Sequence, residues 1–376
     1  MSRKVPLLKM YADETDVEAV SSVIRRHSYW ATGPEIDQFE KELAAFIGTK
    51  HAVVFNSGTS ALHAMLLSFG IQPNDEVVIP SFTFVATANC LLFVGAKPVF
   101  ADIEGQTYGL DVSAVKKKIT KKTKAIMPIH FGGCVCAHIQ ELKELAEEHD
   151  LLFFEDAAQS LGAKLDGTKA GLFGNAAMFS FCQDKIITTG EGGVIVTNDY
   201  DRYEDMKLLV SHGRADDKNY FSSTNLGDYI ALGYNFRMPT MNAALGLSQL
   251  KHIDQIIQMR QRNAANYSRH LQDVSQVKVP QLPGRFYHVF QKYTIEVEHK
   301  RDDLQKYLTA QNIISKAYFG VPVHLTRFYQ TKFGYRHGLL PETEHRAGTV
   351  LTLPSFPELQ NEDIEYITEK IKEYFR

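Results

Sequence analysis

The chain has 376 residues, of which 44% are hydrophobic and 23% charged, and its formal net charge is −3. This balance is typical of a globular enzyme and argues against a protein that binds nucleic acid or a membrane surface through basic charge. The length exceeds the size at which a single core stops growing, so about two domains are expected.

Neither a targeting segment nor a metal site is indicated by the pattern. The N-terminus lacks a secretory signal, and no run reaches the roughly 20 apolar residues of a membrane helix. The four cysteines fit a reducing compartment, so we expect a cytoplasmic protein. Cys134, Cys136 and His138 are three clustered candidate metal ligands, but no second cluster follows them, and no metal is expected.

The first part of the chain alternates between helical and strand patterns. An amphipathic helix is expected over residues 33–48, further helices over 60–70 and 138–150, and an apolar helix after residues 81–83. Continuous apolar runs predict strands over residues 51–55, 76–80, 97–103, 124–131 and 151–157. Because such runs are typical of parallel strands covered on both faces, we predict an α/β domain built from βαβ units.

The pattern changes after Pro239. Residues 239–272 contain few helix breakers after a proline in the first turn, which predicts one long helix. A strand over 293–298 and helices over 300–311 and 361–375 follow it. We therefore expect a large domain over residues 1–245 and a smaller α+β domain over residues 246–376.

The first candidate site lies between a predicted strand and helix. Ser57, Gly58 and Thr59 would place free backbone N–H groups and two hydroxyls at the start of the helix, where an anion binds well. The alternative is an ordinary helix N-cap, since serine and threonine are favoured there.

Two further groups occur where strands end. Asp156 closes a fully apolar strand, where a carboxylate is costly unless it is paired or caps a helix, and Gln159 follows three residues later. Lys185 lies between the apolar runs "MFSF" and "GGVIVTN", so it is either a surface residue or a reactive amine. A lysine becomes a nucleophile near neutral pH only where its surroundings disfavour the charged form.

Together, these three features match the needs of pyridoxal phosphate. An amine forms a Schiff base with the aldehyde, an acid keeps the ring nitrogen protonated, and a helix start holds the phosphate. The alternative is that the lysine is structural and the chain binds an unrelated phosphate ligand.

Five motifs extend this interpretation along the chain. In order they are "NSGTSALHAML", "FTFVATAN", "EDAAQSLGA", "SFCQDKIITTGEGG" and "LGYNFRMPTMNAALGLSQL". They resemble the sugar aminotransferases of the DegT/DnrJ/EryC1/StrS family over essentially the whole chain. The resemblance implies the fold type I aspartate-aminotransferase architecture, with a mostly parallel seven-stranded sheet between helices and a smaller C-terminal α+β domain.

The resemblance also implies roles for individual residues. Lys185 would form the Schiff base and move the proton in the 1,3-shift, while Asp156 would face the ring nitrogen and Gln159 the ring hydroxyl. Phosphate contacts would come from the cradle of Ser57, Gly58 and Thr59 together with Ser180.

Two more family positions concern stacking and assembly. Phe84 matches the aromatic residue that stacks on the cofactor ring, although a core phenylalanine is the alternative. Asn235 matches the asparagine that reaches the phosphate of the neighbouring subunit, which implies a homodimer with shared active sites.

The resemblance implies a ping-pong transfer of the amino group of L-glutamate to a nucleotide-linked keto-deoxysugar. "TTGEGG" resembles perosamine synthase-like members that act at sugar C4. Alternatives are action at C3, a keto-cyclitol acceptor, or a regulatory protein that binds the cofactor without turnover. Because Lys185 is present where a dehydratase branch has histidine, transamination is favoured over dehydration.

Substrate contacts rest on weaker matches. Residues Trp30, Thr32 and Gly33 resemble the family segment near the sugar, and His324 is placed near the nucleotide; packing or turn formation is the alternative for each. Arg237 is expected to pair with a carboxylate or phosphate, or else to form an interface ion pair. Residues 182–184 are Cys-Gln-Asp where many relatives have a histidine and a proline, a change expected to alter the sugar pocket.

Overall fold

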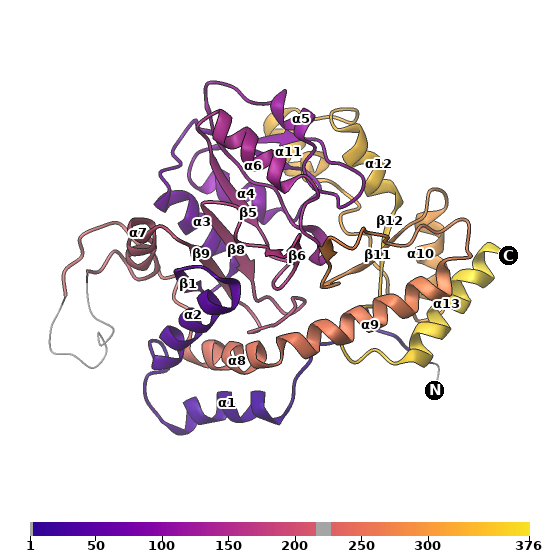
Figure 1. The fold of residues 1–376 in the computed structure, drawn as a ribbon, viewed down its shortest axis with the longest axis horizontal. Coiled ribbons are helices and arrows are strands. Elements are labelled where there is room, and N and C mark those ends of the chain that lie inside the picture. The colour runs from indigo at the N-terminus through magenta and orange to yellow at the C-terminus, as the bar shows by residue number, and fades with distance from the viewer. Residues whose placement is uncertain (1–2, 216–226) are drawn as a thin grey trace.

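The computed structural model describes residues 3–215 and 227–376 (Figure 1). Its helices are α1 (Glu14–Arg25), α2 (Pro34–Ile47), α3 (Gly58–Ser68), α4 (Ala86–Phe93), α5 (Val112–Lys116), α6 (Ile139–Glu148), α7 (Tyr200–Val210), α8 (Thr240–Lys251), α9 (Ile253–Leu271), α10 (Arg301–Ala310), α11 (Arg327–Phe333), α12 (Pro341–Thr349) and α13 (Asn361–Phe375), with short 3-10 turns η1 (Phe131–Gly133) and η2 (Val323–Leu325). Within the described ranges, no helix is both long and apolar enough to cross a membrane.

The strands form one large sheet and two small ones. They are β1 (His51–Phe55), β2 (Glu76–Pro80), β3 (Lys97–Ala101), β4 (Thr123–Ile126), β5 (Leu152–Asp156), β6 (Lys164–Leu165), β7 (Thr168–Lys169), β8 (Ala176–Ser180), β9 (Gly193–Thr197), β10 (Phe286–Tyr287), β11 (Tyr293–Glu296) and β12 (Val350–Leu353). The large sheet has seven strands in the order β1-β9-β8-β5-β4-β2-β3.

The direction of each strand decides where the site forms. β9 runs antiparallel to both of its neighbours, β1 and β8, whereas the other pairs in the large sheet are parallel. Reversing direction twice makes β1 parallel to β8. The carboxyl ends of β1, β2, β5 and β8 therefore lie along one edge of the sheet, together with the start of β9.

Both faces of the large sheet are buried, as the continuous apolar runs predicted. Adjacent residues point to opposite sides, so Val53 and Val54 belong to different core clusters, as do Phe153 and Phe154. One cluster includes residues of α2, α5, α6, α8 and α9, and the other includes residues of α3, α4 and α7. The α/β sandwich with a mostly parallel seven-stranded sheet is confirmed.

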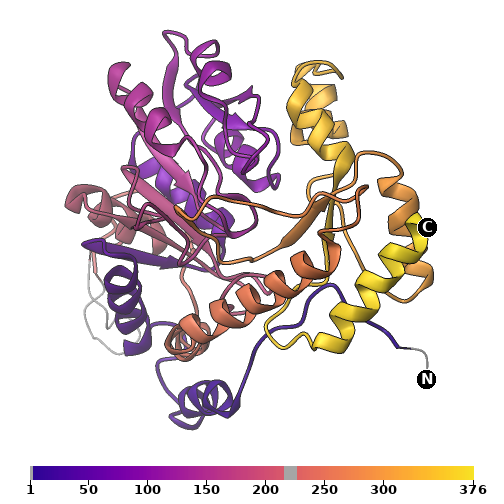
Figure 2. The ribbon, with the colours of Figure 1, turned by 45° about the vertical axis from the view of Figure 1, so that its right-hand side comes forward.

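The C-terminal part is built around the two-stranded antiparallel sheet of β11 and β12 (Figure 2). Its core combines these strands with α9, α10 and α13, and it also takes in Val5 from the N-terminus. Val323 and Tyr329 instead pack into a core cluster of the large sheet. The two cores thus exchange segments, and the boundary between residues 245 and 246 stays a prediction.

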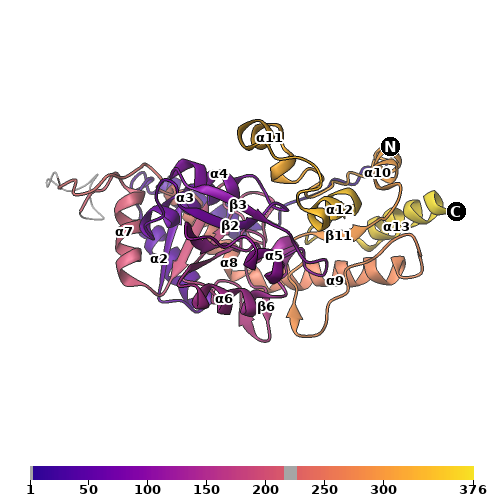
Figure 3. The ribbon, with the colours of Figure 1, turned by 90° about the horizontal axis from the view of Figure 1, so that it is seen from above.

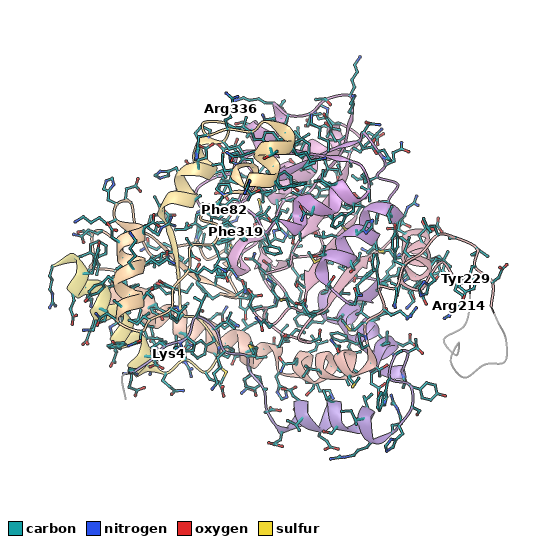
Figure 4. The ribbon with its side chains drawn as sticks, turned by 180° about the vertical axis from the view of Figure 1, so that it is seen from behind. Lys4, Phe82, Arg214, Tyr229, Phe319 and Arg336 are labelled. Atoms are coloured by element: carbon teal, nitrogen blue, oxygen red, sulfur yellow. The ribbon has the colours of Figure 1, made fainter. Side chains whose placement is uncertain are left out.

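Aromatic side chains join the two parts. Phe82 follows β2 and its ring centroid lies 5.7 Å from that of Phe319, which precedes η2 (Figure 4). Both rings pack with Phe131 of η1 at the same sheet edge. Residues that follow strands of the large sheet are thereby held against the C-terminal part.

The helix expected over residues 239–272 is interrupted. α8 ends at Lys251 and α9 begins at Ile253, because His252 has φ −97° and ψ 2°, outside the helical region. The His252 ring lies 3.1 Å from the Thr15 hydroxyl and 3.5 Å from the Asp13 carboxylate, at the start of α1. The two helices run end to end from the large sheet to the C-terminal part (Figure 3).

Candidate active site

Ser57, Gly58 and Thr59 lie at the start of α3, where the anion cradle was predicted, and the N-cap alternative holds for Ser57. The Ser57 hydroxyl accepts a hydrogen bond from the Ser60 N–H at 3.0 Å, so its side chain is the N-cap. The N–H groups of Gly58 and Thr59 lie in the first turn, where a helix offers them no acceptor. A Cβ atom on Gly58 would stand 3.4 Å from the Ser180 hydroxyl, which places β8 against the cradle.

A neighbouring polar atom also fits a ligand at this position. The Asn56 side-chain oxygen is buried and has no hydrogen-bond partner among the described residues. Its amide nitrogen donates to the backbone oxygen of Asn235 at 3.3 Å. Sequence analysis missed Asn56, although an asparagine directly before Ser57 was the available signal.

Asp156 is buried at the end of β5, with only 6% of its surface exposed. One carboxylate oxygen accepts from the Thr87 hydroxyl at 2.7 Å, and the other accepts from the Ala158 N–H at 3.2 Å. Burial raises the pKa of Asp156, whereas these two hydrogen bonds and the charges of Lys185 and His130 act to lower it. Thr87 was missed; the signal was a threonine inside an apolar helix.

A hydrogen bond to its side-chain amide oxygen holds Gln159 in place. The Gln159 side-chain oxygen accepts from the Gly132 N–H at 2.8 Å, and Gly132 has the positive φ of 64° that glycine tolerates best. This contact fixes the side chain at the sheet edge near Asp156. Its contact with a ring hydroxyl stays a prediction.

Lys185 lies in the connection after β8 and is not a surface residue. Its side chain is only 15% exposed, and its amine lies 3.1 Å from a carboxylate oxygen of Asp184. The other oxygen of Asp184 lies 3.3 Å from the amine of Lys292. Lys292 was missed; it directly precedes the buried strand β11, which was the available signal.

Phe84 and Asn235 are both exposed at the site. Phe84 follows β2 and is 62% exposed, which excludes the core-phenylalanine alternative. Asn235 is exposed next to Asn56. Neither the stacking contact nor the reach into a second subunit is tested by these positions, so both stay predictions.

The candidate sugar segment is tied to the start of α8. The Gly33 N–H donates to the Thr240 hydroxyl at 2.7 Å, and the Thr240 N–H donates to the Trp30 carbonyl at 2.9 Å. Asn242, two residues later, donates to the carbonyls of Thr189 and Glu191 at 2.9 and 3.0 Å. α8 therefore connects this segment to the loop that carries Lys185.

Within this segment, Trp30 is 48% exposed, and its ring N–H donates to the Val23 carbonyl at 3.2 Å. Thr32 is partly buried. Contacts of these residues with a sugar stay predictions.

The other two candidate substrate contacts have protein partners. His324 is fully buried, and its ring nitrogens lie 2.7 Å from the Ser81 hydroxyl and 3.2 Å from the Glu344 carboxylate. This geometry supports the packing alternative for His324, and its approach to a nucleotide stays a prediction. Arg237 donates to the Ser211 hydroxyl at 3.0 Å.

The clustered cysteines are placed in the core. Cys134 and Cys136 are buried, and burial raises the pKa of Cys136 to about 12. His138 lies apart at the surface, 3.3 Å from Glu141. Across residues 3–215 and 227–376, no group of three or more His, Cys, Asp or Glu side chains could hold a metal ion.

Comparison with curated proteins shows long matches to several sugar enzymes and one regulator. The chain is 39% identical over 300 residues to GDP-perosamine synthase of Caulobacter vibrioides, covering 78% of each chain. It is 35% identical to a UDP-N-acetyl-3-dehydro-alpha-D-glucosamine 3-aminotransferase of Acidithiobacillus ferrooxidans, covering 89% and 86%. It is also 37% identical to a "Pleiotropic regulatory protein" of Geobacillus stearothermophilus, covering 96% and 95%.

Solved structures give the same picture. Helicobacter pylori PseC, an aminotransferase involved in the biosynthesis of pseudoaminic acid, superimposes with a TM-score of 0.92 at 31% identity over 99% of both chains. The PLP-form of the putative sugar aminotransferase Spr1654 of Streptococcus pneumoniae has a TM-score of 0.90 at 25% identity over 99% and 98%. The model of the DegT/DnrJ/EryC1/StrS aminotransferase family matches residues 10–372. The chain therefore belongs to this family of sugar aminotransferases and is an enzyme.

Proposed function

We propose that the protein is a pyridoxal phosphate-dependent aminotransferase that moves the amino group of L-glutamate to a nucleotide-linked keto-deoxysugar. The observation that carries the proposal is the sheet edge at which a shielded amine, a buried carboxylate and a free helix start meet. When bound there, pyridoxal phosphate would supply an electrophilic aldehyde and a ring that accepts electrons. Both half-reactions of the ping-pong cycle would use this one edge.

The residues at this edge fit the cofactor in kind and in number. The N–H groups of Gly58 and Thr59 and the hydroxyl of Ser180 would hold the phosphate at the start of α3. The unsatisfied oxygen of Asn56 lies beside them and would accept from a donor or an ordered water. A larger residue at Gly58 would crowd Ser180 and fill part of this space.

Asp156 would keep the ring nitrogen protonated. Thr87 and Ala158 each donate to one of its carboxylate oxygens, so the charged form is stabilised and the side chain cannot turn away. Gln159, fixed by Gly132, would face the ring hydroxyl, and the exposed ring of Phe84 would stack on the cofactor.

Lys185 would hold the aldehyde and would also carry the proton that moves during transamination. Both tasks need a neutral amine at one stage, because an ammonium group has no free electron pair. Its 15% exposure limits the access of water to that amine.

For the acceptor, we propose amination at sugar C4. The "TTGEGG" segment and the 39% identity to GDP-perosamine synthase support this position. The 35% identity to a relative named as a 3-aminotransferase supports the C3 alternative. The enzyme is first converted with L-glutamate to the form that carries pyridoxamine phosphate, and is then incubated with 3-keto nucleotide sugars, 4-keto nucleotide sugars or keto-inositol. Amination of the 3-keto sugar alone would contradict the C4 proposal.

A second candidate is a regulatory protein that binds the cofactor without turnover. The relative named as a pleiotropic regulatory protein is 37% identical over 96% of the chain. The intact set of Lys185, Asp156 and the α3 start favours catalysis, since binding alone does not need a shielded amine.

The visible absorption spectrum tests the main proposal. Protein with pyridoxal phosphate is scanned before and after L-glutamate is added, for wild type, Lys185→Ala and the control Lys278→Ala. We expect a lysine-dependent visible band in wild type and the control, bleached by L-glutamate, and no such band in Lys185→Ala. A band that L-glutamate and other amino donors leave unchanged would favour the regulator, and no band in wild type would reject the proposal.

A further inference from the structure

A second lysine lies behind the reactive one, and both share a single carboxylate. Asp184 places one oxygen 3.1 Å from the Lys185 amine and the other 3.3 Å from the Lys292 amine. Lys292 is more shielded, with a side chain that is 5% exposed. Its amine also donates to the Gln291 side-chain oxygen at 2.9 Å, and Gln291 donates to the Asp184 backbone oxygen at 2.6 Å. The pair is therefore fixed in position from two sides.

The other groups that face Lys292 add positive charge or none. Arg260 of α9 is buried and donates to backbone carbonyls, at 3.3 Å to Gln291 and 3.1 Å to Ser355. The ring centroid of Tyr318, which precedes η2 in the chain, lies 4.3 Å from the Lys292 amine. Lys185 and Lys292 thus contact the one carboxylate of Asp184, and the charge of Arg260 also interacts with it.

The charges in this cluster compete for protons. Burial lowers the pKa of Lys292 to about 7, helped by the charge of Lys185 and opposed by Asp184. For Asp184, burial acts to raise the pKa, but the charge of Lys292 and then that of Lys185 outweigh it and lower the pKa to about 2. Lys292 and Lys185 therefore both keep Asp184 ionised, each through its charge and a hydrogen bond.

We propose that Lys292 is a positioning residue for Lys185, whose ammonium group holds Asp184 so that Lys185 can lose its proton and leave the ion pair to react. A carboxylate 3.1 Å from Lys185 would otherwise favour its unreactive ammonium form. A second cation on the same carboxylate weakens that attraction and repels the Lys185 charge. The inference deepens the proposed function and rests on the role given there to Lys185.

The effect has a direction in pH. Lys292 is charged below about pH 7, because burial lowers its pKa to about 7, and there it competes most strongly with Lys185. Above that pH, Lys292 becomes neutral and Lys185 keeps Asp184 to itself. Removing Lys292 should therefore suppress the reactivity of Lys185 most at low pH.

The test measures the Lys185 amine directly, in protein without cofactor. Pulse labelling with acetic anhydride from pH 6 to pH 9, followed by mass spectrometry, gives the labelling rate of Lys185 relative to its own rate at pH 9. For Lys292→Met we expect Lys185 to label about tenfold more slowly than in wild type at pH 6, and nearly as in wild type at pH 9. Lys292→Arg should keep the wild-type rate at pH 6.

Further variants separate charge from packing. Asp184→Asn should speed the labelling of Lys185 at pH 6, and Asp184→Asn with Lys292→Met should return it to within about threefold of wild type, because both charges are then absent. Lys278→Met is the control, since Lys278 lies 3.3 Å from Glu296 and is 66% exposed. Thermal unfolding of each variant checks that it folds.

The outcomes separate this inference from the proposed function. The inference is overturned if Lys292→Met folds and the labelling rate of Lys185 depends on pH as in wild type. If Lys292→Met does not fold, an unchanged labelling profile in Asp184→Asn overturns the inference instead. The labelling needs no cofactor, so a missing visible band with the expected labelling profile rejects only the proposed function. A normal band with an unchanged profile rejects only the role of Lys292.

Discussion

Asp156 is a carboxyl group buried at an apolar sheet edge. Burial raises its pKa, so folding disfavours the ionised form, and two hydrogen bonds recover only part of that loss. A raised carboxylate pKa makes the folded state less stable as the pH rises through the pKa of the unfolded chain. Ionised Asp156 would thus lower the stability of the fold, and the proposed contact with the cofactor ring gives a reason for its presence.

Replacing Asp156 with asparagine should therefore have opposite effects on stability and activity. We expect the free energy of unfolding of Asp156→Asn without cofactor to exceed that of wild type at pH 7, and this difference to vanish near about pH 3.9, the usual pKa of the unfolded carboxyl. The amino transfer rate should fall about hundredfold, because the ring nitrogen loses its charged partner.

Urea unfolding at both pH values and single-turnover kinetics measure the two effects. Asp273→Asn, which changes an exposed carboxylate, serves as the control. A lower stability for Asp156→Asn at pH 7 would contradict the prediction.

The sequence points to Lys185 and Asp156 because each follows a recognisable strand, and the structure shields both side chains from solvent. It could not identify Thr87 or Lys292, since their contacts join residues 69 and 108 positions apart in the chain. A threonine in an apolar helix and a lysine before a strand have many roles, and only the folded arrangement of the elements selects one. Contacts between residues so far apart in the chain cannot be predicted from a single sequence.

At the level of elements, the start of α3 depends on how closely β9 approaches it. A Cβ atom on Gly193, the first residue of β9, would stand 2.7 Å from the Gly58 Cα atom. Because that contact is with backbone, no side-chain rotation relieves it. β9 is also the reversed strand, so this approach exists only because its start lies at the carboxyl edge.

Gly193→Ala should displace the cradle. We expect its free energy of unfolding to fall by about 1–3 kcal/mol and its affinity for pyridoxal phosphate to fall with it, because the α3 start must move. Thermal unfolding and a cofactor titration measure these effects. Gly284→Ala is the matched control, since a Cβ there meets nothing within 4 Å. Equal behaviour of the two variants would show that the cradle is not built by this contact.

A second link between elements joins the end of β2 to α12. Glu344 accepts from the N–H groups of Gly338 and Leu340 and lies 3.2 Å from the His324 ring, which in turn contacts Ser81. Burial acts to raise the pKa of Glu344, but these donors lower it to about 2. A lowered carboxylate pKa gives stability above the unfolded pKa, and that stability is lost as the pH falls.

Glu344→Gln should consequently be less stable than wild type by about 1 kcal/mol at pH 7. The difference should shrink as the pH falls from about 4.3, the usual glutamate pKa, towards 2, where wild-type Glu344 is itself protonated. Urea unfolding across this range measures it, with the exposed Glu369→Gln as control. A difference that does not depend on pH would mean that packing rather than charge carries the link.

Strand patterns located the first five strands, although the strand expected over 124–131 was too long, since β4 ends at Ile126 and η1 begins at Phe131. Five apolar runs predicted β1 to β5, because strands buried on both faces have almost no polar positions. The single helix over residues 239–272 was wrong at His252, where contacts with the start of α1 accompany the break. The helix propensity of residues 239–272 contains no information about α1, which is more than 200 residues away in the sequence.

At the scale of the whole molecule, exposed apolar side chains gather just before Asn235. Tyr229, Ile230 and Leu232 are 56%, 61% and 82% exposed. Tyr229 pairs with Arg214 in a bridge that lies away from the main body (Figure 4). Apolar groups exposed together in this way are typical of a surface that another chain covers. They support the homodimer that the family resemblance implies, in which Asn235 would complete the site of the partner.

Mixing two inactive variants tests that proposal. Lys185→Ala removes the reactive amine, and Asn235→Asp places a carboxylate where the partner's phosphate would bind. If sites are shared, a mixed dimer has one site with both defects and one site with neither. Random exchange of equal amounts makes about half of the dimers mixed, so we expect about a quarter of wild-type activity after the subunits are exchanged in mild denaturant.

The test compares the activity of the mixture with the activity of each variant alone. Each variant alone, carried through the same exchange, should stay near its own low activity, because every one of its sites has the same single defect. If Asn235 acted within its own chain, every site in a mixed dimer would still have one defect, and mixing would recover nothing. Lack of recovery, with subunit exchange confirmed by native mass spectrometry, would therefore contradict the shared site while leaving the role of Lys185 intact.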